Sequence, residues 1–300
     1  KFQKIVCAYL AEYAVKYFGE EQLESNSFTY RLKTILDNVM YLMKHIMEEL
    51  SQSEFFVADC ELKIGEDIPS YTIVLPDGHK IAVCGSVDRV DIMQRADITY
   101  LRIIDYKTGT KQFKLSDILY GINLQMLLYL HSIEASGGDK YGEIVPAGIL
   151  YMPATVPYIS SDSLKSIDKL PDELNKKLKM NGLLLKDTEI IHGMDKTDVA
   201  TYIPVKIKAG EPVSSTSLAT LAEFGKIFKK VDMLIAEMGK NIYNGNIEAK
   251  PLKGGHDSCE YCPYDSVCAY RQSNPITCFS VDNKTVIEEI TNEINGKEEE

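Results

Sequence analysis

The sequence Tyr100-Leu101-Arg102-Ile103-Ile104-Asp105-Tyr106-Lys107-Thr108-Gly109 places an acid and a lysine directly after a short apolar run. Such a run, Tyr100 to Tyr106, predicts a β-strand with an apolar centre. Asp105 and Lys107 are two residues apart, so they lie on the same face of that strand. Gly109 allows another backbone to approach closely. The stretch therefore predicts a chemical site at the end of a buried strand.

A second acid stands upstream, in Gly85-Ser86-Val87-Asp88-Arg89, at the end of another predicted strand. If the two strands pair, Asp88 and Asp105 converge on one point. Two carboxylates are hard oxygen ligands that suit Mg²⁺ or Mn²⁺, and the backbone carbonyl of Tyr106 is a further candidate ligand. A metal so held lowers the pKa of a bound water, and Lys107 can orient that water or neutralise developing charge.

A predicted helix over residues 119–133 adds a third element, Gln125-Met126-Leu127-Leu128-Tyr129. Gln125 and Tyr129 are four residues apart and share one face of the helix. Together they offer hydrogen bonds to a phosphate or to a metal-bound water.

The order of predicted elements indicates an α/β fold, in which helices flank a mixed β-sheet. Residues 55–153 read as four strands, a helix and a fifth strand. Further expectations are an edge strand at Leu183-Leu184-Leu185 and a long amphipathic helix over 218–242. The predicted divisions of the chain are a helical segment over 1–54, a core over 55–245 with an insertion at 154–213, a cysteine segment over 246–280 and a solvated acidic tail over 281–300.

The 300 residues carry 33 basic and 44 acidic side chains, a net charge of −11. This balance argues against a protein that coats phosphate backbones nonspecifically, but it allows a local basic lip. No run approaches the ~20 apolar residues of a membrane span. No signal peptide is visible, and we expect a cytoplasmic protein. The chain begins at Lys1 without a methionine, so we expect it to be processed or cut from a longer protein.

Three of the seven cysteines form a tight group, Cys259-x2-Cys262-x5-Cys268. Cys7, Cys60, Cys84 and Cys278 are isolated. This spacing suits a metal or iron–sulfur site in a reducing compartment better than disulfides. Three thiolates can hold three corners of a [4Fe–4S] cluster. A zinc site completed by His256 or Cys278 is the alternative.

Taken together, Gly85-x-x-Asp88-Arg89, Asp105-Tyr106-Lys107-x-Gly109, Gln125-x-x-x-Tyr129 and the cysteine group resemble the PD-(D/E)XK nuclease superfamily. The resemblance is to its RecB-type branch, and within it to AddB-type nuclease domains. It implies a restriction-endonuclease-like core and a metal-dependent DNA exonuclease that hydrolyses phosphodiester bonds with a metal-activated water. It further implies double-strand-break processing in a helicase–nuclease complex with an AddA-like partner subunit.

The resemblance also implies residue roles. Asp88 and Asp105 are the expected metal ligands, Lys107 is the expected catalytic lysine, and Gln125 and Tyr129 are the motif on the following helix. Glu61 matches the acid that opens the first strand of the family, where a supporting role and a structural contact are equal alternatives. Apart from the resemblance, the basic residues near the expected site, Arg89, Lys111 and Lys114, are expected either to contact backbone phosphates or to be ordinary surface charges.

AddB-type domains hold a [4Fe–4S] cluster with three late cysteines and one upstream cysteine in a Cys-Pro-Phe-like run. Here Cys7 is followed by Ala8-Tyr9, and its helical setting indicates packing instead. The family's Gly-x-x-x-His pattern is also missing around His45. We therefore expect the cluster to be incomplete or absent in a chain that begins at Lys1.

A second class of function stays open: a nuclease fold with an inert site that docks a partner or guides DNA. Loss of a carboxylate or of the lysine usually marks such modules, and Asp88, Asp105 and Lys107 are all present. An ATPase is unsupported because the sequence has no G-x-x-x-x-G-K-[ST] loop.

Overall fold

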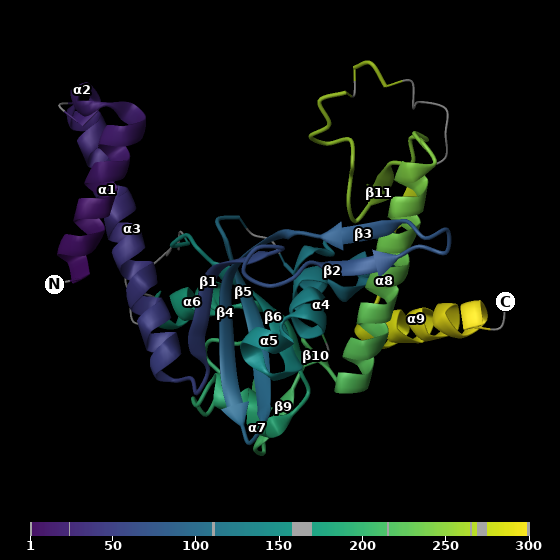
Figure 1. Ribbon diagram of the computed structural model, residues 1–300. Coiled ribbons are helices and arrows are strands. Elements are labelled where there is room, and N and C mark those ends of the chain that lie inside the picture. Colours follow the sequence, from purple (N-terminus) through teal and green to yellow (C-terminus); the bar gives the residue numbers. More distant parts are fainter. Residues whose placement is uncertain are drawn as a thin grey trace.

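The computed structural model describes residues 2–23, 25–109, 112–157, 170–214, 216–264, 266–268 and 275–298. Its centre is a six-stranded mixed sheet in the order β1-β4-β5-β6-β7-β10 (Figure 1). The strands of this sheet are β1 (Phe56–Ile64), β4 (Gly85–Arg95), β5 (Ile98–Lys107), β6 (Glu143–Pro153), β7 (Asn181–Leu185) and β10 (Leu218–Ala219). The expected α/β class is confirmed.

Strand direction follows from the connections. Strands β1, β4 and β5 are antiparallel neighbours. Strand β6 runs parallel to β5, because the helix α4 (Gln125–Ser136) carries the chain back across the sheet. Strand β7 is antiparallel to β6. The start of β4, the end of β5 and the start of β7 therefore lie at one end of the sheet.

Helices cover both faces of the sheet. On one face lie α4, the short α5 (Gly138–Tyr141) and α8 (Leu221–Tyr243); Thr99 Oγ1 of β5 donates to the backbone oxygen of Tyr141 (2.6 Å). The other face carries the last turns of α3 (Asn26–Ser51) and α7 (Thr188–Met194), where Gly193 packs against Met93 of β4. The helix α6 (Leu170–Leu178) precedes β7.

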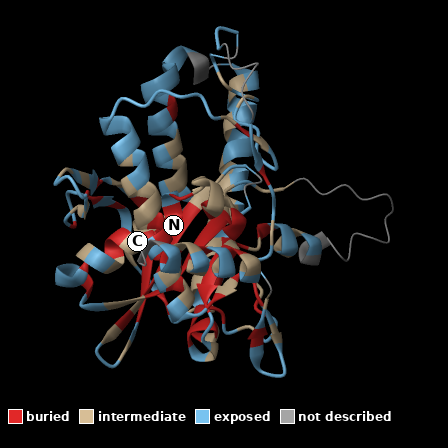
Figure 2. Ribbon diagram, turned by 90° about the vertical axis from the view of Figure 1, so that its right-hand side faces the viewer, coloured by how far each residue is buried: buried red, intermediate tan, exposed pale blue. Residues whose placement is uncertain are grey.

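The hydrophobic core is the sheet and the helix faces against it (Figure 2). Leu101, Ile103, Leu150 and Leu183 are completely buried. Strands β5, β6 and β7 are buried along most of their length, because helices pack on both sides of them.

Residues 71–88, where the strand pattern continues from one predicted strand to the next, divide into two parts. Strands β2 (Tyr71–Val74) and β3 (Lys80–Val83) form a separate two-stranded sheet, and β4 starts anew at Gly85. The hairpin packs against α8, where a side chain at Gly239 would meet Ile81 Cγ1 at 2.9 Å.

The N-terminal helices are α1 (Phe2–Phe18), α2 (Glu20–Leu23) and α3. They extend from one flank of the sheet (Figure 1). The polar stretch between the two long helices contains α2. Tyr9 and Tyr13 recur at helical spacing on α1 but are 70% and 55% exposed, so they do not form a buried stripe.

Two expectations about the later elements are also wrong. Strand β7 is not an edge strand, because it pairs with both β6 and β10. The acidic tail is not simply solvated. Residues Asn283–Glu298 form α9, which buries Val286 and Ile290 against the core because they are four residues apart on one helix face.

The remaining small elements are η1 (Leu115–Tyr120), β8 (Lys206–Lys208), β9 (Glu211–Val213), β11 (Leu252–Gly254) and β12 (Ile276–Cys278). Among the residues that the structure describes, every helix is too short or too polar to span a lipid bilayer.

Candidate active site

Five strands contribute one residue each to a single row across the sheet. Asp105 of β5 pairs with Tyr151 of β6, and Tyr151 pairs with Asn181 of β7. On the other side, Arg89 of β4 pairs with Ile104 of β5, and continuing this register by one residue places Asp88 opposite Asp105. The β1–β4 register then places Glu61 opposite Asp88. We call this set, Glu61, Asp88, Asp105, Tyr151 and Asn181, the polar row.

Asp105 and Lys107 are in direct contact. The Lys107 Nζ lies 2.5 Å from Asp105 Oδ2 and 5.6 Å from the centre of the Tyr151 ring. The lysine side chain is 27% exposed and the acid 13%. The catalytic lysine expected from the sequence is therefore held between a carboxylate and an aromatic face, with its ammonium still open to solvent.

Asp88 reaches across to β5. Its Oδ2 accepts a hydrogen bond from the backbone N–H of Tyr106 (2.9 Å), the residue between Asp105 and Lys107. The structure thus brings the two expected ligand carboxylates to neighbouring positions on paired strands. The Tyr106 carbonyl, the third expected ligand, belongs to the same segment of β5.

Gln125 and Tyr129 lie together on α4, as their spacing predicts: Gln125 Nε2 donates to Tyr129 Oη (3.4 Å). A side chain at Gly85 would lie 2.5 Å from Tyr129 Cζ. Gly85 therefore leaves room for the tyrosine ring beside the start of β4, and this contact joins the first motif to the third.

Tyr151 and Asn181 were not among the expected site residues. Tyr151 is buried, and burial together with the Asp105 and Asp117 charges raises its pKa to about 12. The Asn181 Oδ1 accepts from the backbone N–H of Phe113 (2.7 Å), which ties the chain after β5 to β7. The available signal was a polar residue near the end of an otherwise apolar strand.

Glu61 has an unusual backbone. Its φ is +55°, in the left-handed region, although it lies within β1. Its Oε2 accepts a hydrogen bond from Ser86 Oγ (3.1 Å). The structure therefore places Glu61 beside Asp88 with a contact to β4, which leaves both alternatives for its role as predictions.

Arg89 does not face the site, and the expectation that it contacts phosphate is wrong. Its side chain is 2% exposed and donates to Asp91 (2.7 and 2.6 Å) and Glu49 (3.0 Å). Arg102 joins the same two acids. Because side chains alternate along a strand, Arg89 points away from the face that carries Asp88.

Of the two other expected phosphate contacts, Lys111 lies outside the described residues. Lys114 lines a polar hollow of about 260 Å³ together with Gln112, Asp117 and His256. The charge of Asp117 in this hollow acts on Tyr151 of the polar row, as the charge of Asp105 does.

The donors of the row fit a divalent cation. Asp105 Oδ2 is buried and accepts no hydrogen bond from the part of the chain that the structure describes; its contact with Lys107 is an ion pair. Within the same residues, no three His, Cys, Asp or Glu side chains gather as a ligand set. Two carboxylates suit Mg²⁺, which usually keeps several waters.

The cysteine group does not form such a set. Cys259 and Cys262 are half-buried, Cys268 is exposed, and all three are free thiols. Cys278, the zinc alternative, is buried in β12. Because no three metal-ligating side chains come together among the described residues, the iron–sulfur and zinc assignments stay predictions without support from the geometry.

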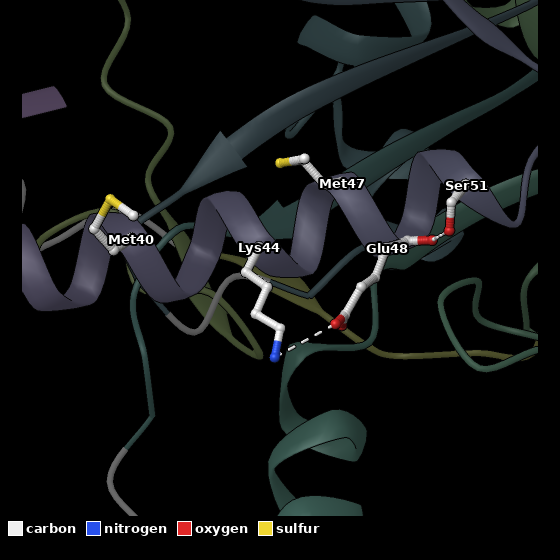
Figure 3. Close-up of a pocket in the computed structure, with 5 residues that line it drawn as sticks. All are labelled: Met40, Lys44, Met47, Glu48 and Ser51. Carbon is white, nitrogen blue, oxygen red and sulfur yellow. Dashed lines mark hydrogen bonds and ion pairs between the residues drawn. The ribbon is translucent and has the colours of Figure 1, made fainter. Parts of the chain in front are cut away.

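The hollow in Figure 3 lies on the helix α3, apart from the polar row. Its lining comes from α3 alone: Met40, Lys44, Met47, Glu48 and Ser51. Lys44 pairs with Glu48 at 3.7 Å. It contains no residue of the polar row and has no part in the site.

An α/β fold with two acids and a lysine on paired strands, followed by a helix bearing Gln and Tyr, defines the class of protein. The chain belongs to the PD-(D/E)XK nuclease superfamily, whose family model matches residues 6–269.

Two similar curated relatives come from one group within this superfamily. The chain is 38% identical over 246 residues to the B subunit of the ATP-dependent helicase/deoxyribonuclease of Thermoanaerobacter sp. (strain X514), covering 80% of this chain and 21% of that protein. The protein of the same name from Alkaliphilus oremlandii is 36% identical over 88% of this chain and 24% of its own. The chain thus spans about a fifth to a quarter of these relatives.

Proposed function

We propose that this chain is a metal-dependent deoxyribonuclease domain that hydrolyses phosphodiester bonds at the polar row. The observation that supports this most strongly is the placement of Asp88 and Asp105 on paired strands with the Lys107 ammonium 2.5 Å from Asp105. Loss of a carboxylate or of the lysine usually marks an inert docking module, whereas Asp88, Asp105 and Lys107 are all present here.

Asp88 and Asp105, with the Tyr106 carbonyl, would hold Mg²⁺ or Mn²⁺. A cation bound there supplies an activated water and stabilises negative charge on the reacting phosphate. Lys107 brings a positive charge to the phosphate oxygens, where charge develops. Gln125 and Tyr129 offer hydrogen bonds that orient the phosphate against the row.

The test is the release of nucleotides from a labelled linear DNA, with Mg²⁺ or with EDTA. We expect Asp105→Asn to reduce the rate to background and Lys107→Met to reduce it at least about 100-fold. Asp97→Asn, an exposed acid in the turn between β4 and β5, is the matched control and should retain the rate. DNA that the wild-type chain binds but leaves intact would favour the inert docking module.

The names of the relatives suggest the kind of complex in which the domain acts. Their name describes one subunit of an ATP-dependent helicase/deoxyribonuclease. We infer that the domain acts as an exonuclease in such a complex, on DNA delivered by a helicase with an AddA-like partner subunit, during double-strand-break processing. Assembly with that subunit, measured by gel filtration of the co-expressed proteins, tests the inference; separate elution of the two would contradict it.

The metal content of the cysteine segment is a separate question. We propose that the late cysteines belong to a [4Fe–4S] site that is incomplete in this chain. Iron, sulfide and zinc analysis of the anaerobically purified chain tests this. Four irons and four sulfides per chain would show a complete cluster, and one zinc would show the alternative.

A further inference from the structure

A second hollow, of about 530 Å³, lies between the end of α6 and the β8–β9 hairpin. Four lysines line it: Lys176, Lys179, Lys206 and Lys208. The rest of the lining is apolar or uncharged and includes Met180, Pro204, Val205 and Ser214. We call it the lysine hollow.

The lysines of the hollow form no ion pair with a carboxylate in the part of the chain that the structure describes, although the charge of Asp195 acts on Lys179. Elsewhere lysines pair with acids, as Lys63 does with Glu66 and Lys140 with Asp59. Within the residues that the structure describes, none of the four hollow lysines pairs with a carboxylate. Four like charges around one space in a chain of net charge −11 repel one another unless an anion enters.

One of the four is fixed in place. Lys179 is half-buried, and its Nζ donates to the backbone oxygens of Ala200 (2.6 Å) and Val205 (2.9 Å). Burial lowers the pKa of Lys179 and Lys206 acts in the same direction, whereas Asp195 opposes them. Lys179 thus has a fixed position in the lining, while Lys176, Lys206 and Lys208 are exposed.

The lysine hollow is close to the polar row along the chain. Lys179 is two residues before Asn181, the last member of the row, and Met180 N–H donates to the Tyr202 oxygen (2.9 Å). Asn181 is two strands from Asp105, about 10 Å at ordinary strand spacing, and two further residues add about 7 Å. This distance corresponds to a few nucleotides of a DNA strand.

We propose that the lysine hollow binds backbone phosphates of a single DNA strand a few nucleotides from the bond at the polar row. The proposal rests on the proposed nuclease function. A strand has regularly spaced negative charges for the lysines and bases that can lie on Met180, Pro204 and Val205, the combination that single-strand grooves use. The regular spacing of phosphates and the flat faces of the bases favour a DNA strand over an acidic protein.

The experiment measures binding, not cleavage. The variant Lys176→Gln/Lys206→Gln/Lys208→Gln removes the three exposed charges and keeps Lys179, whose ammonium holds two loop carbonyls. The control Lys240→Gln/Lys250→Gln/Lys284→Gln removes three exposed charges elsewhere. Binding of a labelled single-stranded 20-mer is followed by fluorescence anisotropy in EDTA, over a range of salt concentrations.

We expect the hollow variant to raise Kd at least tenfold and to reduce the slope of log Kd against log salt by about 2, since each phosphate contact contributes about 0.7. The control should stay within twofold of wild type. Equal effects of the two variants would overturn the proposal. So would wild-type binding of a polyglutamate probe in place of DNA that is lost in the hollow variant, because this would assign the hollow to an acidic protein.

A separate assay distinguishes failure of the proposed nuclease function from failure of the proposed DNA binding at the lysine hollow. Wild-type hydrolysis of bis(p-nitrophenyl) phosphate with Mg²⁺ reports on the polar row, because this small diester does not extend to the lysine hollow. No hydrolysis of this diester or of DNA would reject the nuclease function. The anisotropy result in EDTA would still decide whether the hollow binds DNA.

Discussion

Gly85 and Tyr129 share one space beside the start of β4. A Cβ at position 85 would lie 2.5 Å from Tyr129 Cζ and 2.7 Å from Cε1, closer than carbon atoms approach. We expect Gly85→Ala to displace the ring and to destabilise the fold by about 1–3 kcal/mol, the usual cost of overpacking. Chemical denaturation measures this change.

A double-mutant cycle separates this clash from a general effect of the glycine. In a Tyr129→Ala background the space is empty, so Gly85→Ala should cost less than about 0.5 kcal/mol. An unchanged cost in that background would mean that the ring does not occupy the space beside Gly85.

Arg89 and Glu49 belong to a buried ion cluster on the other face of the sheet, with Asp91 and Arg102. Removing one charge leaves its partners buried and unpaired, which typically costs about 3–5 kcal/mol. We therefore expect Glu49→Gln to lower the free energy of unfolding by about this amount. Glu48→Gln, which breaks an exposed pair with Lys44, should cost less than about 1 kcal/mol. Similar costs for the two variants would argue against the buried cluster.

The directions of some individual side chains could be predicted from the sequence, but their distant partners could not. The spacing of Asp105 and Lys107 predicted their shared face, and strand alternation could have predicted that Arg89 points away from Asp88. The partners of Arg89 could not be predicted, because Glu49 is 40 residues earlier and on a helix. Pairing between distant charges depends on tertiary packing, which no local pattern encodes.

At the scale of elements, His131 joins the β2–β3 hairpin to α4 and α8. Its Nε2 lies 3.2 Å from both Tyr71 Oη and Asp232 Oδ2, and its Nδ1 lies 3.2 Å from Glu134. The ring also stacks on Phe228, 4.6 Å between centres. Burial alone would lower the pKa of His131, but hydrogen bonds to Asp232 and Glu134 outweigh it and raise the pKa to about 9.

This shift predicts a pH dependence of stability. The folded pKa of about 9 lies above the value of about 6.5 in an unfolded chain, so protonated His131 stabilises the fold. The contribution is full below about pH 6.5 and is lost as pH rises through 9; at about 1.4 kcal/mol per unit it is about 3 kcal/mol. Denaturation at pH 6 and pH 9.5 measures it. His131→Gln should remove most of the difference, whereas His192→Gln should not.

The packing of α9 on the core leads to a second prediction about an element. Ile290 is completely buried on it, and Lys230 of α8 pairs with Glu293 at 2.5 Å. We expect Ile290→Ala to destabilise the fold by about 2–5 kcal/mol, as large-to-small core changes do. Glu288→Ala, an exposed change on the same helix, should stay within about 0.5 kcal/mol. Equal melting temperatures of the two variants would mean that α9 does not pack on the core and that this segment is a solvated tail.

Elements with a strong period could be predicted from the sequence, and those decided by packing could not. The stripe of α8 predicted that helix to within a few residues. The apolar spacing of Val286, Ile290 and Ile294 was present too, but the acidic residues around it led to the prediction of a tail. The position of β7 inside the sheet depends on β10, which has two residues and no pattern of its own.

At the scale of the molecule, the site is assembled from residues between 61 and 181, yet each lies at one end of the sheet. Acids and lysine on β4 and β5 could be predicted because hairpin-connected strands usually pair. The β6 and β7 members, Tyr151 and Asn181, depend on a crossover and on an insertion, so their register could not be predicted from sequence.

The N-terminal helices are the most separable part of the molecule (Figure 1). The helix α1 packs on α2 and α3, and the buried polar side chains of α3, His45 and Glu49, lie in its last two turns. Stability differs between regions according to the contacts each makes with the core.

We therefore expect removal of residues 1–24 to change the free energy of unfolding of the core by less than about 1 kcal/mol. Removal of residues 1–50, which includes Glu49, should cost several kcal/mol more, because Arg89 and Arg102 lose a buried partner. Denaturation of the two shortened chains, followed by tyrosine fluorescence and circular dichroism, measures the difference. Equal losses in both would mean that the core depends on α1.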